Sequence, residues 1–154
     1  MSTPEDRVLA LHLVFPPAPK PVAVYKSAIR TGNLLFVSGH GPLKEDGTLI
    51  LGTVGKDLTL EDGKGAARQT GLAILATLKA NLGSLNKVKR LIKSLGMVQC
   101  TPEFHDHPKV INGYSELMKE VFGDDAGVGA RSAVGMNALP SGMAVEIEAI
   151  FEVE

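Results

Sequence analysis

The C-terminal eleven residues constrain the fold most strongly because apolar and acidic side chains alternate along them. Odd positions from Val145 to Val153 are apolar, whereas four of the five even positions from Glu146 to Glu154 are glutamate. A period of two predicts a β-strand with one buried face and one polar face. The chain must therefore build a sheet that is covered on one side.

The segment before this strand predicts its partner. "ARSAVGM" is β-rich, and Leu139-Pro140-Ser141-Gly142 is a turn signal. We therefore expect a hairpin over 131–153, in which paired residue numbers sum to about 281. Glu146 would then lie opposite Gly135, roughly 13 Å along the strand from Arg131. The two side chains are then too far apart for an ion pair, but they can hold a small ligand between them.

Ordinary surface charge is the competing interpretation of these residues. A solvated acidic face is the expected role of Glu148, Glu152 and Glu154. Arg131 alone could equally be a surface residue. Its guanidinium, however, has the fork geometry that suits a carboxylate, and a glutamate such as Glu146 can move protons or orient water.

The rest of the chain predicts an α+β domain over 22–154. Two β-rich runs, 22–29 and 34–38, flank the turn Thr31-Gly32-Asn33. Apolar residues at steps of three and four predict helices over 61–82 and 108–123. Because strands and helices mix without regular alternation, we expect both helices on one face of a mixed sheet. Further expected elements are a short strand at 49–51, a strand over 87–100, and an N-terminal arm over 1–21 with a short helix and a proline-rich connector.

Composition narrows the class of protein. The 154 residues are 44% hydrophobic and 21% charged, with a formal net charge of −1, which fits one ordinary globular domain. Aromatic residues make up 5% and there is no tryptophan, which disfavours a dedicated nucleic-acid binder. The single cysteine, Cys100, permits no intrachain disulfide, so we expect a reducing cytoplasm. We expect neither a signal peptide nor a membrane span.

Other polar clusters have ordinary explanations. His105-Asp106-His107 has a spacing compatible with metal ligands, but Asp106 is better explained as a helix-entry residue, and we expect no metal. Cys100 lacks a clear histidine partner in the sequence and is expected to be inert. The basic run from Lys87 to Lys93 is typical of a solvated strand edge, with RNA contact as a weaker alternative. His40, between two glycines at a strand end, is the histidine best placed for a role.

Three separated blocks resemble one protein family. "ARSAV", then "LP" and "VEIEAI", resemble the C-terminal signature of the RidA/YjgF family, also called the endoribonuclease L-PSP family. "NLLFVSG" resembles its N-terminal block, and "VINGYSELMKEVFG" resembles its second helix. The resemblance covers residues 22–153. It implies a chorismate-mutase-like fold assembled as a homotrimer, with pockets between subunits.

The resemblance also implies an activity. Its best-defined form is hydrolysis of reactive enamines and imines, such as 2-aminoacrylate and 2-iminobutanoate, to 2-keto acids and ammonia, without cofactor or metal. By this resemblance Arg131 binds the substrate carboxylate, Glu146 positions the attacking water, and Tyr25 is the pocket tyrosine. Residues implied to bind or orient the substrate are Arg131, Ser38, Gly39, His40, Asn112 and Ala133.

Several positions depart from the family pattern. His40 stands where the family has glutamine, Ala133 where a cysteine is frequent, and Lys26-Ser27 replaces the usual pair after the tyrosine. His40 could add a proton shuttle near neutral pH. The departures leave two alternatives open, namely a non-catalytic trimer that binds small carboxylates, and an endoribonuclease or translation inhibitor.

Overall fold

A five-stranded mixed sheet forms the framework of the protein in a computed structural model that describes residues 1–154. The strand order is β1-β2-β5-β3-β4; β3 and β4 run parallel, and the other neighbours are antiparallel. The α+β class is thereby confirmed. The strands are β1 (Ala28–Thr31), β2 (Leu34–His40), β3 (Val88–Gln99), β4 (Ala130–Met136) and β5 (Val145–Val153).

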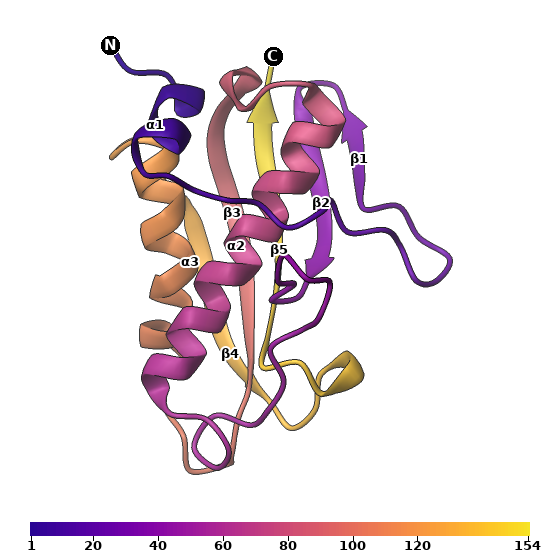
Figure 1. The fold of residues 1–154 in the computed structure, drawn as a ribbon, viewed down its shortest axis with the longest axis vertical. Coiled ribbons are helices and arrows are strands. Elements are labelled where there is room, and N and C mark those ends of the chain that lie inside the picture. Colours follow the sequence, from indigo (N-terminus) through magenta and orange to yellow (C-terminus); the bar gives the residue numbers. More distant parts are fainter.

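Two long helices, α2 (Leu60–Leu82) and α3 (His107–Phe122), lie side by side over one face of this sheet (Figure 1). We call this the helix face and the opposite side the outer face. A third helix, α1 (Pro4–Ala10), packs near the end of α3, and two short 3₁₀ turns, η1 (Leu85–Lys87) and η2 (Pro140–Gly142), complete the fold. None of these helices combines the length and apolar character needed to cross a membrane.

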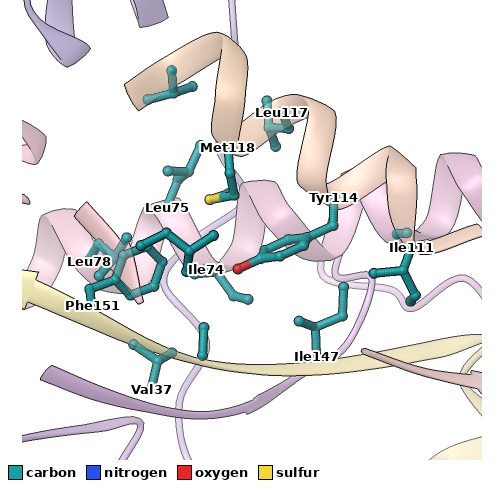
Figure 2. Packing of buried hydrophobic residues seen from close by; sticks show 14 of the residues in the cluster. Val37, Ile74, Leu75, Leu78, Ile111, Tyr114, Leu117, Met118, Ile147 and Phe151 are labelled. Atoms are coloured by element: carbon teal, nitrogen blue, oxygen red, sulfur yellow. The ribbon is translucent and has the colours of Figure 1, made fainter. Parts of the chain in front are cut away.

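The core lies between the two helices and the sheet. Tyr114 of α3 points into this core (Figure 2). Its hydroxyl is hydrogen-bonded to Ser94 Oγ of β3 at 2.8 Å. The predicted apolar stripe of the first long helix is buried as expected. The other labelled core residues in Figure 2 are Ile74, Leu75 and Leu78 from α2, Ile111, Leu117 and Met118 from α3, and Val37, Ile147 and Phe151 from the sheet.

Backbone contact between α2 and α3 is unusually close at Gly113. A Cβ added there would overlap the Lys64 carbonyl oxygen, so only glycine permits this crossing. The ends of α2 are fixed by local chemistry. Thr59 and Asp62 form a capping box at the start of the helix, and Gly83 ends it in the left-handed conformation.

The predicted hairpin over 131–153 is wrong. β4 and β5 do not pair, because β3 runs between them and bonds to both. The turn signal at 139–142 is real, but it forms η2 within a longer connection rather than a two-residue loop. Gln99 holds that connection, since its side chain accepts from the Leu139 amide and donates to the Gly52 and Gly142 carbonyls.

Two other strand predictions also need correction. β1 begins at Ala28, so the segment 22–27 is not the start of a strand, and it projects beyond the sheet edge (Figure 1). Prolines at 19 and 21 lack amide donors, which disfavours regular pairing just upstream. The segment 49–51 makes only isolated bridges, Leu43 with Leu49 and Leu51 with Met143.

The N-terminal arm packs against the domain through both polar and apolar contacts. The Glu5 carboxylate accepts from the Leu85 amide at 2.9 Å and pairs with Lys79 at 3.0 Å. Val8 is buried in the same core cluster as the sheet residues. The arm therefore closes one end of the core.

Candidate active site

Arg131 lies on the edge strand β4 and turns toward α3. Its Nη1 donates to Ser115 Oγ at 3.0 Å, and its Nη2 donates to the Pro108 carbonyl at 3.2 Å. Both acceptors belong to α3, so the guanidinium lies on the helix face. These two bonds use two of the five N–H donors of an arginine, and three remain for a ligand.

A cleft of about 230 Å³ adjoins Arg131, between α3 and the loop that precedes β4. Asn112 and Ser115 form its polar wall, and they share one stripe of α3 with Pro108 at spacings of four and seven residues. The structure thus brings the predicted Asn112 and Arg131 together. The remaining lining residues are Leu91, Ser94, Gly127, Val128, Gly129 and Ala130.

Glu146 points to the outer face of the sheet. Its neighbours Val145 and Ile147 are fully buried on the helix face, and side chains alternate along a strand. Gly39 of β2 lies against the carboxylate, where any Cβ would collide with Oε2. Partial burial, and next the nearby Glu148 charge, raise the pKa of Glu146 above its usual value. A carboxyl group with a raised pKa is better suited to accept a proton from water.

One copy of the chain therefore does not bring Arg131 and Glu146 into a single pocket. The sheet separates them, with Arg131 on the helix face and Glu146 on the outer face. Within the sheet, Arg131 lies beside Ser94 and Glu146 beside Met97, so β3 also stands between their strands. The predicted placement of both residues on paired strands of one hairpin, with Glu146 opposite Gly135, is therefore wrong.

Ser38 and Tyr25 lie on the side of the molecule away from Arg131. Ser38 lines a groove of about 480 Å³ on the outer face, and its Oγ donates to the Lys26 carbonyl at 2.6 Å. Tyr25 is 45% exposed in the projecting segment before β1. The groove is lined by Ile29, Phe36, Val37, Ser38, Lys93, Leu95, Ser132, Glu148, Ala149 and Ile150.

His40 is buried on the helix face and lies in neither the cleft nor the groove. Its Nδ1 is 2.5 Å from the Ser38 carbonyl, and its Nε2 is 2.7 Å from Thr77 Oγ1 of α2. The Ser38 carbonyl can only accept, so Nδ1 carries the proton and Nε2 accepts from Thr77. Burial lowers the pKa of this histidine. A proton shuttle needs access to the substrate, which this placement does not provide.

The structure gives Cys100 a histidine partner that sequence reasoning missed. Its Sγ lies 3.4 Å from His107 Nε2, because the end of β3 and the start of α3 meet there. Burial nevertheless raises the pKa of the Cys100 thiol, which disfavours the reactive thiolate.

Asp106 is the N-cap residue of α3, and no group of three or more potential metal ligands gathers in the chain. Ala133 is half-buried and packs against the core.

Ser115 and Pro108 were not identified from the sequence, although a signal existed. Their shared stripe with Asn112 follows from helical spacing once the helix is assigned. Their contact with Arg131 could not be inferred, because the predicted hairpin assigned a different neighbour to the strand.

Comparison with known proteins agrees with this fold. Residues 5–145 match the family described as "YjgF/chorismate mutase-like, putative endoribonuclease". This span includes most of the chain, from the first helix to the start of β5. The chain belongs to this family, and the resemblance seen in its sequence blocks is confirmed.

Individual relatives cover nearly the whole chain. Protein TCP17 of Trypanosoma cruzi is 39% identical over 92% of this chain and 89% of its own length. The crystal structure of Atu1372, a protein of unknown function from Agrobacterium tumefaciens, is 40% identical, with a TM-score of 0.89 over 99% of this chain and 94% of that one. A 2-iminobutanoate/2-iminopropanoate deaminase of Dermatophagoides farinae is 28% identical over 90% of this chain and 93% of its own length.

Proposed function

We propose that this protein hydrolyses short enamine and imine acids, of the 2-aminoacrylate and 2-iminobutanoate class, to 2-keto acids and ammonia. The observation that carries the proposal is the local environment of Arg131 and of Glu146. Arg131 has free donors beside a small cleft, and Glu146 is a partly desolvated carboxyl group against a glycine. The deaminase relative supports the same chemistry at the level of the family.

Arg131 binds the substrate carboxylate in this proposal, with Asn112 beside it. A bidentate pair uses two of the three donors that the protein leaves free. An enamine substrate first tautomerises to the imine. Glu146 orients a water molecule and takes one of its protons as the water oxygen bonds to C2, while the C=N π electrons move to nitrogen, which gains a proton. Nitrogen of the resulting carbinolamine gains a second proton, the C2–N bond breaks to release ammonia, and the hydroxyl group loses its proton as the C2=O bond of the keto acid forms. Positioning is expected to account for most of the rate enhancement.

The separation of Arg131 and Glu146 leads us to propose a homotrimer whose pockets lie between copies. Each pocket would take Arg131 and Asn112 from one copy, and Glu146, Gly39 and Ser38 from its neighbour. Exposed apolar side chains on the outer face support such an assembly, since Ile29 and Phe36 are exposed there around the groove. The projecting Tyr25 would complete the wall.

The test generates 2-iminobutanoate in the cuvette from an amino acid oxidase reaction and follows its decay. Wild-type protein should speed the decay above the buffer rate, whereas Arg131→Ala and Glu146→Gln should reduce the gain at least tenfold, in line with loss of a positioned group. Glu116→Ala is the control, because Glu116 only pairs with Lys64 on the exposed side of α3. A wild-type rate equal to buffer would overturn the deaminase proposal.

Binding without turnover is the second candidate. One observation favours it, because the residues that depart from the family pattern add no reacting group to the cleft. His40 is held in the core, and Ala133 presents only a methyl group. Calorimetry with 2-oxobutanoate separates the two functions, since the binding alternative predicts Arg131-dependent heat with no imine hydrolysis.

A further inference from the structure

The hydroxyl group of Ser115 stands out because it contacts the arginine of the proposed site and nothing in the reaction assigns it a role. Arg131 is on an edge strand, where a long side chain has many rotamers available. Two contacts restrict it, one to the Ser115 hydroxyl and one to the Pro108 carbonyl. They engage the two terminal nitrogens separately, so together they fix both the position and the tilt of the guanidinium plane.

The two acceptors have fixed positions of their own. Both belong to α3, whose buried side packs against α2 and the sheet. Ser115 directly follows Tyr114, which is fully buried and hydrogen-bonded to Ser94 of β3. Ser94 in turn lies beside Arg131 across the β3–β4 ladder. Near Arg131, α3 is therefore connected to the sheet through the buried Tyr114 as well as through the arginine itself.

We propose that Ser115 is a positioning residue that holds the Arg131 guanidinium in the orientation that receives a substrate carboxylate. This inference rests on the proposed function of Arg131. Preorganisation strengthens binding because the side chain loses less conformational freedom when the ligand arrives. Ser115 itself need not contact the substrate. Its effect is expected on affinity and KM, because a carboxylate contact is made alike in the ground state and the transition state.

A structural role and a positioning role predict different results for Ser115→Ala. Alanine has a higher helix propensity than serine, so this change should leave thermal stability equal or slightly raised. The ligand affinity should nevertheless fall, by about three- to tenfold, as one hydrogen bond to a charged group is lost. The Pro108 carbonyl is unaffected by the substitution, which is why the loss is expected to be partial.

The experiment measures 2-oxobutanoate affinity by calorimetry and the kinetics of 2-iminobutanoate hydrolysis for four proteins. These are wild type, Ser115→Ala, Ser115→Thr, which retains the hydroxyl, and the control Glu116→Ala, whose partner Lys64 lies away from the cleft. The expected result is weaker affinity and higher KM for Ser115→Ala alone, with kcat nearly unchanged.

Three outcomes would overturn the proposal. Wild-type affinity in Ser115→Ala would exclude positioning while leaving the function of Arg131 intact. An equal loss of affinity in Ser115→Ala and Ser115→Thr would show that the loss does not depend on removing the hydroxyl group. Wild-type protein with neither binding nor turnover would overturn the proposed function, and this inference with it, before any variant is compared.

Discussion

Arg131 and Glu146 lie on opposite faces of one sheet, with β3 between their strands. Arg131 bonds to α3 on the helix face, and Glu146 lies against Gly39 on the outer face. Two residues arranged in this way can act on one small molecule only if another copy of the chain supplies one of them. The proposed homotrimer and the proposed reaction therefore depend on each other.

Glycine at position 113 should contribute strongly to the stability of the fold. Gly113→Ala would place a methyl group on the Lys64 carbonyl oxygen and force α2 and α3 apart. We expect a loss of about 1–3 kcal/mol in the free energy of unfolding, as for other overpacked cores. Gly65→Ala is the matched control, because a Cβ there meets nothing within 4 Å and α2 should gain about 0.5–1 kcal/mol. Chemical denaturation measures both, and equal stabilities would contradict the close crossing.

Assembly should depend on the outer face. Phe36 is exposed there and lines the groove, so Phe36→Asp would place a charge in the proposed contact between copies. Light scattering should show the mass of three chains for wild type and of one chain for this variant. Leu9→Asp places the same charge on an exposed position of α1 and should leave the mass unchanged. A wild-type protein of one-chain mass at micromolar concentration would refute the trimer.

Glu146 should make the fold less stable as the pH rises. Its pKa is raised in the folded state, so the folded chain holds the proton more tightly than the unfolded chain. Stability is then lost as the pH rises from near the ordinary glutamate pKa of 4.5 through the raised pKa. Glu146→Gln removes this titration and should be more stable than wild type at neutral pH. The difference in stability between the two proteins should shrink on acidification, which denaturation at fixed protein concentration measures. A stability difference that stays constant across pH would argue against a raised pKa for Glu146.

His40 predicts the opposite pH dependence. Burial lowers its pKa from 6.5, so the unfolded chain binds the proton first as the pH falls. Its contribution to stability is present above pH 6.5 and is lost below that value. His40→Gln keeps a donor and an acceptor for Ser38 and Thr77 but does not titrate. Thermal unfolding should therefore be less sensitive to acid in this variant; identical pH profiles would contradict a buried neutral histidine.

Local patterns predicted the elements well, because spacing of apolar residues reports directly on which face is buried. The strand at 145–153, both long helices and the class of the fold follow from that spacing. Strand neighbours did not follow, because alternation along β5 says which side is buried and not which strand lies beside it. The segment 131–143 looked like half of a hairpin, yet β3, more than thirty residues upstream, occupies that place.

The site was predictable in its residue types and not in its geometry. The sequence blocks pointed to Arg131, Glu146 and Asn112, and the acidic alternation already indicated the outer face for Glu146. The face of the sheet to which Arg131 points could not be predicted, because "ARSAVGM" has no clear apolar period. The burial of His40 was also hidden, since its contact with Thr77 joins a strand end to a helix 37 residues away.

Subunit complementation tests the central claim most directly. Arg131→Ala and Glu146→Gln proteins, each expected to be at least tenfold less active toward 2-iminobutanoate than wild type, are unfolded together at equal concentration and refolded. If each pocket takes Arg131 from one copy and Glu146 from another, about a quarter of the pockets in randomly mixed trimers are intact, and activity should return to about that fraction of wild type. No recovery, with wild type refolding to full activity under the same conditions, would contradict a pocket shared between copies.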